Sequence, residues 1–422
     1  MLDLHTLARA CCVATHWRDG CCKLKNDWIW QAEFNRVFTD STFLENAEQT
    51  GTTWRSLCYL QGRSRVGWLH GQVSRQQYQG HKDRVRHVRI RQDTVVSASW
   101  DHTLRVLNLE DETSQQVDDP QDAQQQQQDA SATKQVVLHG GSVFGVVFDG
   151  RVAVTCSEDT TIKVWHVHQE NRKTELIGHE KPVYRVAMIS SEVLISCSRD
   201  FVGVWHWPSG TLQKQLFGHT HDVHRIQVSD SLIVTGSYDC TVRVWEYPSL
   251  NELWSSTSCH EKGLSSLHFE GNVLATGSGA GQVFVWDLAE RGLKYEFDSS
   301  QHCEQTISCI LVAGYRAFST SSIGHLQHDG VVCIWDVRRG RLLQRLQESF
   351  FINALKKDFG FIFCACSDGY MRIRDPEGDQ FDILREFQHG DRALYDVDVQ
   401  GPRAVTCGLD TMVVVWTVDG VN

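Results

Sequence analysis

Gly178–Trp205, GHEKPVYRVAMISSEVLISCSRDFVGVW, decides the fold, because the same arrangement returns about forty residues further on as Gly218–Trp245, GHTHDVHRIQVSDSLIVTGSYDCTVRVW. Each stretch contains a Gly-His pair, an alternating apolar segment, a turn of small residues that carries an Asp, and an apolar strand that ends in Trp. A repeat of this period is typical of solenoids and propellers, in which every unit brings its own share of the core. We therefore expect repeated units rather than a single core.

Six further units keep this frame while their residues drift. They are Gly80-His81 with Ser97 to Asp101; Leu138-His139 with Thr155 to Asp159 and Trp165; Cys259-His260 with Thr276 to Ala280 and Trp286; Gln301-His302 with Asp329 and Trp335; a copy that ends at Asp368 and Arg374; and His389 with Thr406, Asp410 and Trp416. Eight units are thus counted, although the last two are weak enough to leave seven open. Asp and Trp are six residues apart in most units but five between Asp200 and Trp205, which predicts a shortened or bulged strand there.

The recurring polar residues of a unit suit one buried hydrogen-bonded chain that runs from the turn Asp through His and a hydroxyl to the indole N–H. Two units supply all four partners: His179, Ser196, Asp200 and Trp205, and then His219, Thr235, Asp239 and Trp245. Recurrence at constant offsets marks these residues as structural, so we reject a His/Asp hydrolase and expect no enzyme.

Composition narrows the function further. The 422 residues carry a net charge of −11, which argues against nucleic acid as a partner, and no apolar run is long enough to cross a membrane. The 15 cysteines fall largely in strand-like segments, so we expect reduced core thiols, with neither a metal nor another cofactor. The start lacks the order of a secretion signal, which predicts a cytoplasmic or nuclear protein or both.

Residues from about 80 to 418 resemble the WD-repeat family. The resemblance implies an all-β propeller of four-stranded blades, eight in number with seven still open, over residues 71–419. Residues 71–78 would supply the outer strand that closes the last blade and removes its open edge. Residues 112–134, acidic and rich in Gln, should form a disordered loop within the propeller.

The front of the chain shows a helical pattern of apolar residues at steps of three and four. Leu2-Asp-Leu-His-Thr-Leu7, Val13, Trp17-Arg18 and Trp28-Ile-Trp30 together resemble the second half of an F-box, over residues 1–40, and residues 41–70, with Trp54-Arg-Ser-Leu57, resemble the helical linker that follows it. The family's opening Leu-Pro helix is not seen before Leu2, so a helical cap tethered to the propeller is the alternative. The residues expected to bind a Skp-type adaptor are Leu4, Leu7, Val13 and Trp17.

The combined resemblance implies the substrate-recognition subunit of a cullin-type ubiquitin ligase, with the Skp-type adaptor, the cullin and a substrate protein, phosphorylated or not, as partners. A WD-repeat scaffold without a ligase role is the alternative. In such propellers two positions per unit face the substrate, the one after the first apolar residue of the inner strand and the one before the turn Asp. The substrate-binding residues expected from this rule are Arg86, Trp100, Phe144, Tyr184, Arg199, His224, Tyr238 and Tyr395. Arg199 resembles an arginine that holds phosphate with its guanidinium fork.

Overall fold

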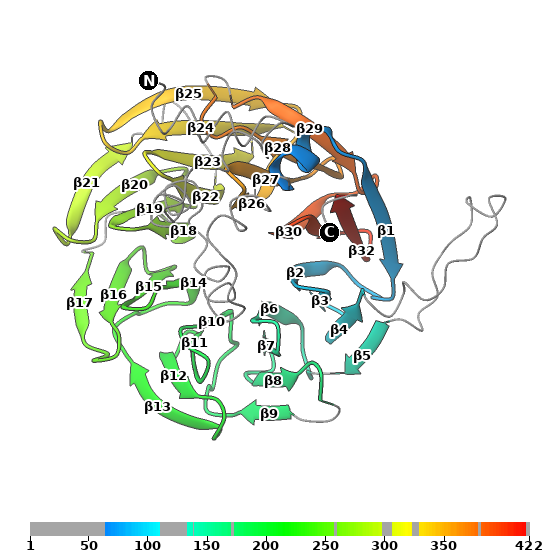
Figure 1. Ribbon diagram of the computed structural model, residues 1–422. Helices are drawn as coiled ribbons and strands as arrows, with labels where there is room; N and C mark the ends of the chain where they lie inside the picture. Colours follow the sequence, from blue (N-terminus) through cyan, green and yellow to red (C-terminus); the bar gives the residue numbers. More distant parts are fainter. Residues whose placement is uncertain are drawn as a thin grey trace, which may run out of the picture.

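The computed structural model describes residues 64–109, 133–137, 139–169, 173–256, 260–297, 306–322, 329–378 and 381–418. The strands in these ranges form eight four-stranded antiparallel sheets, which stand around a central channel like the blades of a propeller (Figure 1). The predicted all-β propeller is therefore confirmed with eight blades, and the alternative of seven is excluded. The inner strand of each blade borders the channel and the fourth strand forms the outer edge.

The blades are numbered in chain order, and their strands run from the channel outward. The first four blades are β2 (Val85–Arg91), β3 (Thr94–Ser99), β4 (Thr103–Asn108) and β5 (Thr133–Val137); β6 (Val143–Phe148), β7 (Val152–Ser157), β8 (Ile162–His166) and β9 (Lys173–Leu176); β10 (Arg185–Met188), β11 (Val193–Cys197), β12 (Val202–His206) and β13 (Thr211–Leu216); and β14 (Val223–Val228), β15 (Leu232–Ser237), β16 (Val242–Glu246) and β17 (Glu252–Ser255). The last four are β18 (Leu264–Glu270), β19 (Val273–Ser278), β20 (Val283–Asp287) and β21 (Gly292–Phe297); β22 (Ile307–Ala313), β23 (Arg316–Ser322), β24 (Gly330–Asp336) and β25 (Arg341–Glu348); β26 (Ile352–Asp358), β27 (Phe361–Cys366), β28 (Tyr370–Arg374) and β29 (Ile383–Gln388); and β30 (Leu394–Gln400), β31 (Arg403–Gly408), β32 (Met412–Val418) and β1 (Val73–Gln79).

The eighth blade closes the ring with strands from both ends of the propeller. β1 pairs antiparallel with β32 from Val73↔Val418 to Gln79↔Met412. This confirms that the segment just before the first Gly-His pair supplies the outer strand. Closure pairs the exposed edge of β32 and ties the first described strand to the last, so the ring cannot open without breaking this ladder.

A short helix at residues 64–70 precedes β1 and is the only helix in the part of the chain that the structure describes. Its Trp68 is fully buried between the seventh and eighth blades, edge-on to Phe363 and Phe387 at centroid distances of 5.4 and 6.0 Å. The indole Nε1 donates to the Gly401 carbonyl at 3.2 Å, and Arg385 donates to the Trp68 carbonyl at 3.1 Å. The chain thus enters the propeller at a fixed position.

Several expectations fall on residues outside the described ranges. The partial F-box over residues 1–40, with Leu4, Leu7, Val13 and Trp17, lies outside them, as does most of the expected linker, whose last seven residues coincide with the helix at 64–70. β5 begins at Thr133, so it includes the last two residues of the range expected to be a loop. Within the described residues, no helix is long and apolar enough to span a membrane.

The core lies between neighbouring blades, because strand residues alternate between the two faces of each sheet and both faces are covered. Between the fifth and sixth blades, for example, Val283 packs with Ile307 and Trp335 in one buried cluster. Eight wedges of this kind replace a single central core. The ring therefore leaves its middle to the side chains of the inner strands.

The third blade differs from its neighbours in the turn before its third strand. There Cys197 pairs with Val202 and encloses four residues, whereas in the fourth blade Gly236 pairs with Val242 and encloses five. β12 and β16 are equally long, so the expected shortened strand was wrong. A bulge is present between Val204 and Trp205, but the fourth blade has the same bulge between Val244 and Trp245, so the missing residue comes from the turn. Phe201 occupies the shortened turn and stacks on His179 with ring centroids 4.2 Å apart.

Candidate functional site

The polar residues that recur in the repeat form buried hydrogen-bonded chains inside the blades. In the third blade, His179 Nδ1 lies 2.8 Å from Asp200, its Nε2 lies 2.7 Å from Ser196 Oγ, and Trp205 Nε1 donates to the same hydroxyl at 2.8 Å. In the fourth blade the corresponding distances for His219, Thr235 and Trp245 are 2.8 Å to Asp239, 2.9 Å and 3.3 Å. Every member of these two networks has a hydrogen-bond partner inside the blade, so these residues hold the turns in place.

The aspartate of each hydrogen-bonded chain is held in its ionised form. Burial opposes ionisation of Asp200, but the hydrogen bonds from His179 and from the backbone N–H of Glu180 outweigh it and lower the pKa to about 2. For Asp239, burial is likewise outweighed by His219 and Thr241, which lower the pKa well below its usual range. The turns that carry Arg199 and Tyr238 are thus fixed by the residues that directly follow them.

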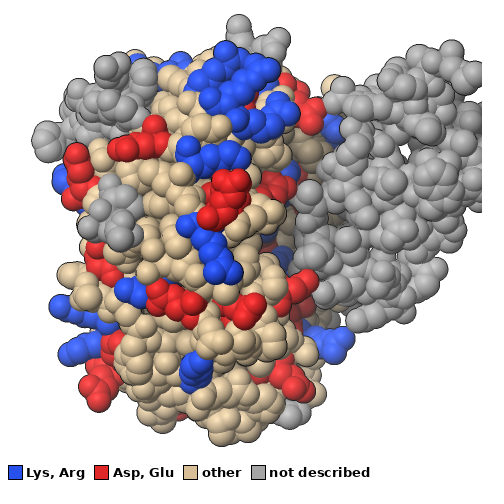
Figure 2. Space-filling view, turned by 90° about the vertical axis from the view of Figure 1, so that its left-hand side faces the viewer, with Lys and Arg blue, Asp and Glu red and all other residues tan. Residues whose placement is uncertain are grey.

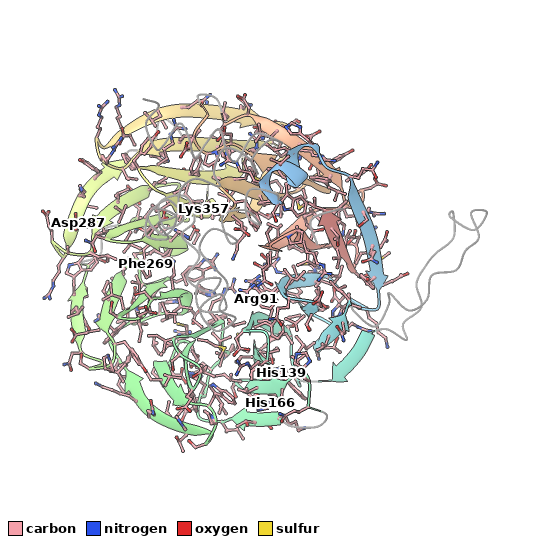
Figure 3. All side chains as sticks on the ribbon, in the orientation of Figure 1. Arg91, His139, His166, Phe269, Asp287 and Lys357 are labelled. Carbon is pink, nitrogen blue, oxygen red and sulfur yellow. The ribbon has the colours of Figure 1, made fainter. Side chains whose placement is uncertain are left out.

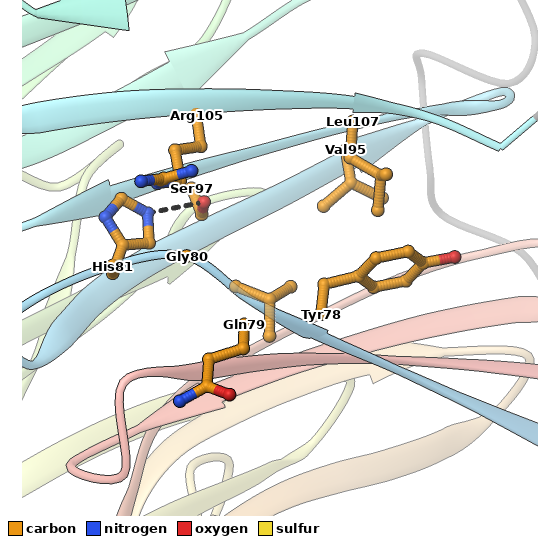
Figure 4. Close-up of a pocket in the computed structure, with 9 residues that line it drawn as sticks. Tyr78, Gln79, Gly80, His81, Val95, Ser97, Arg105 and Leu107 are labelled. Carbon is orange, nitrogen blue, oxygen red and sulfur yellow. Dashed lines mark hydrogen bonds between the residues drawn. The ribbon is translucent and has the colours of Figure 1, made fainter. Parts of the chain in front are cut away.

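The first blade lacks the indole of this network and has a small pocket in its place. Leu107 pairs with Val95 at the position where the fourth blade pairs Trp245 with Ile233. Leucine is smaller than tryptophan, which leaves a gap beside the His81–Ser97 hydrogen bond of 2.9 Å (Figure 4). Tyr78, Gln79, Gly80, Arg105 and Val413 complete its lining. Because Tyr78, Gln79 and Val413 belong to the eighth blade, the pocket is a packing gap between the first and eighth blades.

A β-bulge marks the start of the inner strand in seven of the eight blades. The register shifts there between Val85 and His87 and at the corresponding residues of the other six blades, so that one residue has no direct partner. The skipped residues occupy the first substrate-facing position of their units, and they are Arg86, Phe144, His224, Ser265, Ser308, Asn353 and Tyr395. A bulge re-aims the extra side chain, which turns these residues out of the blade and towards their neighbours.

Four of the predicted substrate-binding residues contact one another in a continuous row across the second, third and fourth blades. Phe144 stacks on Tyr184 with centroids 5.7 Å apart, Tyr184 lies 4.0 Å from His224, and His224 stacks on Tyr238 at 4.1 Å. Tyr238 is 46% exposed, so the row ends at the surface. Phe144, Tyr184, His224 and Tyr238 are called the aromatic arc below.

Three further predicted residues form a second group where the eighth blade meets the first. The Arg86 guanidinium lies over the Tyr395 ring at 4.6 Å and near the Trp100 ring at 5.5 Å. Arg84, which the repeat pattern did not single out, covers Trp100 at 4.5 Å. The eighth predicted residue, Arg199, is largely exposed beside the arc, with its Nε 3.9 Å from Asp222. The structure thus brings the predicted residues together in two groups, while their role in binding is still a prediction.

In the fifth and seventh blades, the first substrate-facing position carries a small polar residue instead of an aromatic one. Ser265 Oγ donates to the Ile307 carbonyl at 2.6 Å, and Asn353 Nδ2 donates to the Leu394 carbonyl at 2.6 Å, each in the next blade along the chain. These polar side chains are engaged with neighbouring blades and offer no aromatic surface. Among the described residues, the ring contacts of the predicted substrate-facing positions thus lie in the eighth blade and the first four.

Side chains one, three and five positions further along the inner strands line the channel, and the repeat pattern missed them. Asp396 of the eighth blade accepts from Arg89 at 2.6 Å and from His87 at 3.2 Å, and Asp398 accepts from Arg91 at 3.0 Å. Figure 3 labels Arg91 and Lys357 among the side chains that border the central opening, with His166 and Asp287 further out. Arg185 and Arg225 hold, in the third and fourth blades, the strand position that His87 holds in the first blade. The sequence could have identified these two arginines, because in both Val183-Tyr-Arg185 and Val223-His-Arg225 the arginine stands two residues after the valine of the inner strand.

Histidines on the inner strands have lowered pKa values, as His224 and His87 show. Burial and then the guanidinium groups of Arg225 and Arg185 lower the pKa of His224 to about 4. Burial also lowers the pKa of His87 to about 4, although the hydrogen bond to Asp396 acts in the opposite direction. Among the described residues, no cluster of three or more His, Cys, Asp or Glu side chains is arranged to hold a metal ion.

The eight four-stranded sheets and the repeated hydrogen-bonded network define an eight-bladed β-propeller with WD40 repeats. The family model described as "WD domain, G-beta repeat" matches residues 72–108, 133–166, 210–246 and 251–287. The complete hydrogen-bonded chain of the third blade, from His179 to Trp205, lies outside the matched segments. No curated protein sequence matches the chain.

Among solved structures, the chain is similar to the computationally designed Ika8 protein. The two share 22% sequence identity at a TM-score of 0.67, over 81% of this chain and 98% of Ika8. At this identity the likeness extends to the fold alone. The family model that matches is generally found in protein-interaction scaffolds, and no F-box model matches the chain.

Proposed function

We propose that the aromatic arc, together with the group of Arg86, Trp100 and Tyr395, binds a segment of a partner protein. The observation that carries the proposal is the unbroken row of ring contacts from Phe144 to Tyr238, which ends in a half-exposed tyrosine. Aromatic residues and arginine dominate the binding energy of protein interfaces because they bury large areas at low entropic cost. WD40 propellers are interaction scaffolds, which agrees with this use of the face.

The proposal is tested by quantitative affinity purification of the full chain from its host cells. The double variant Arg199→Glu, Tyr238→Ala is compared with Tyr315→Ala, because Tyr315 is 38% exposed but lies in the turn after β22, at the far end of the inner strands. We expect specific partners to be lost from the double variant and retained by Tyr315→Ala. An identical partner set for all three proteins would refute the face as a binding site.

We further propose that this recognition serves a cullin-type ubiquitin ligase. Support comes from the resemblance of residues 2–30 to the second half of an F-box and from the fixed entry of residues 64–71 into the propeller. In this role the chain performs no covalent step: it raises the local concentration of a substrate, phosphorylated or not, and orients its lysine in the cytoplasm or the nucleus. The alternative is a scaffold without a ligase role.

Co-purification with a recombinant Skp-type adaptor and cullin distinguishes the two functions. A ligase receptor should bind both proteins, lose them with Trp17→Ala and keep them with Tyr238→Ala. A chain that binds neither protein would be a scaffold. The affinity purification described above would still decide whether the aromatic arc binds a partner protein.

A further inference from the structure

Exposed basic residues gather at the turn between β24 and β25 in the sixth blade. The stretch Val337–Gln347 contains no acidic residue and has four arginines with exposed side chains, which are Arg338, Arg339, Arg341 and Arg345. Figure 2 shows Lys and Arg side chains gathered at the top of the outer side, where Figure 1 places β24 and β25. The whole chain carries a net charge of −11, so this concentration of positive charge is local. Arg338, Arg339 and Arg341 are called the basic turn below.

The acidic residue next to the basic turn in the sequence is engaged by the backbone of that turn. Asp336 is buried, and its Oδ1 accepts from the backbone N–H groups of Arg338 at 2.9 Å and of Arg339 at 3.1 Å. The Nε of Arg338 lies 4.0 Å from the same oxygen, while the rest of this largely exposed side chain faces solvent. Across the described ranges, no ion pair includes Arg339 or Arg341. The charges of these two guanidinium groups are therefore balanced by no carboxylate that the structure describes.

Tyr295 of the fifth blade holds the basic turn in one conformation. Its hydroxyl donates to the Arg338 carbonyl at 2.6 Å, and its ring packs so closely against Gly340 that a Cβ atom there would clash with it. Gly340 has a φ of +64°, which favours glycine, and its N–H donates to the Asp336 carbonyl at 2.9 Å. The Arg338 guanidinium lies over the Tyr315 ring at 4.4 Å. A turn fixed by these contacts loses little conformational freedom when it binds a partner.

β25 offers an open strand edge beside the basic turn. It is the last strand of its sheet, so its outer edge pairs with no other strand among the described residues. Its 8 residues make it the longest of the outer strands that the structure describes. Leu343 lies at the bulge opposite Ile334 and Trp335, has no direct partner in β24 and is 38% exposed. An extended polypeptide can pair with such an edge through its backbone, and its alternate side chains can then contact the side chains of the strand.

We propose that the basic turn and the edge of β25 bind an extended acidic segment of a partner protein. Guanidinium forks donate charge-assisted hydrogen bonds to carboxylates, and Leu343 adds an apolar contact. A polypeptide is favoured over a membrane or a nucleic acid, because only a polypeptide pairs with a strand edge and the net charge of −11 repels large polyanions beyond the basic turn. The surface lies at the opposite end of the strands from the aromatic arc, so it does not depend on the proposed function.

Fluorescence anisotropy measures binding of the full chain to a labelled peptide of alternating Glu and Val residues at physiological ionic strength, which screens the charges of distant blades. We expect this Glu peptide to bind at least about tenfold more tightly than the same peptide with Gln in place of Glu. The double variant Arg339→Glu, Arg341→Glu should weaken binding of the Glu peptide at least about tenfold, since two attractions become repulsions. The matched control Arg151→Glu, Arg392→Glu reverses two exposed arginines of the second and eighth blades and should bind as the unaltered protein does.

Amide hydrogen exchange tests the pairing of the strand edge and needs no substitution. A segment that pairs with the outer edge of β25 should slow the exchange of backbone amides in this strand. We therefore expect the Glu peptide to protect residues 341–348 and to leave β13, the outer strand of the third blade, unchanged. The melting temperatures of both double variants should stay within about 1 °C of the unaltered protein, because all four arginines are exposed, so lost binding cannot come from lost folding.

Three results would overturn the proposal. The first is absence of binding of the Glu peptide, or binding that Arg339→Glu, Arg341→Glu leaves unchanged. The second is binding of the Glu peptide without protection of β25. The third is binding of phosphatidylserine vesicles or single-stranded RNA, but not of the Glu peptide, that is lost in the same double variant, because the basic turn would then serve a membrane or a nucleic acid.

Discussion

Thr235→Val removes one hydroxyl from the centre of a buried network while keeping the shape of the side chain. Thr235 is fully buried, accepts from Trp245 Nε1 at 3.3 Å and lies 2.9 Å from His219 Nε2. Because His219 Nδ1 donates to Asp239, its Nε2 is the acceptor for the threonine O–H. The substitution therefore leaves one buried donor and one buried acceptor without a partner.

The expected cost follows from these two groups. An unsatisfied buried polar group costs about 1–3 kcal/mol, and the long indole contact belongs at the lower end, so we expect a loss of about 2–4 kcal/mol in the free energy of unfolding. For a propeller of roughly 350 residues, unfolding entropy scales to about 1.4 °C per kcal/mol. The melting temperature should fall by about 3–6 °C.

Differential scanning fluorimetry measures this change against Thr211→Val. The Thr211 hydroxyl is exposed and contacts Ser209 Oγ at 2.8 Å, so water can replace it and the melting temperature should stay within about 1 °C. An equally small change for Thr235→Val would show that the buried network contributes nothing to stability beyond packing, and the reasoning would be refuted.

Three other predictions concern stability. Leu107→Trp should fill the gap of the first blade and place an indole N–H near Ser97, raising the melting temperature by about 1–2 °C; a fall would mean that the gap cannot accept the ring. The pKa of Asp200 is lowered to about 2 in the folded protein, so its ionised carboxylate stabilises the fold fully above the unfolded pKa of ~3.9, and this stabilisation is lost as the pH falls towards 2. In an acid titration, the free energy of unfolding of Asp200→Asn should therefore fall less steeply than that of the unaltered protein. Trp68→Ala removes a fully buried indole, worth about 3–5 kcal/mol, and should make residues 64–71 exchange amide hydrogens and undergo proteolysis much faster; unchanged protection would contradict the role of Trp68.

The repeat pattern predicted the parts of the fold that are local in sequence. One period holds a whole blade, so the His, the hydroxyl, the Asp and the Trp of one unit meet within about 27 residues of chain, and their spacing was sufficient to predict the network. The shortened turn at Phe201 was misassigned to a strand, because a deletion of one residue leaves the same gap in the sequence wherever it lies between Asp200 and Trp205.

The candidate site was predicted only in part. The positions of the arc residues followed from the frame of the repeat, but their mutual contacts did not, because Phe144, Tyr184 and His224 meet rings from other blades about forty positions away. The β-bulges that turn Phe144 and His224 out of their blades are a feature of strand register, which the apolar pattern does not report.

The sequence by itself determined a ring of repeated units, with eight counted and seven left open, and a hydrogen-bonded network in several of them, since the apolar period and the constant offsets act within a single blade. Only the tertiary structure decided which half of the ring presents aromatic residues, and which charges of the channel are paired. Asp396 meets Arg89 across the closure of the ring, whereas Arg185 and Arg225 meet no carboxylate among the described residues. The physical reason is that charge pairing depends on distances between blades, and these are fixed only when the ring has closed.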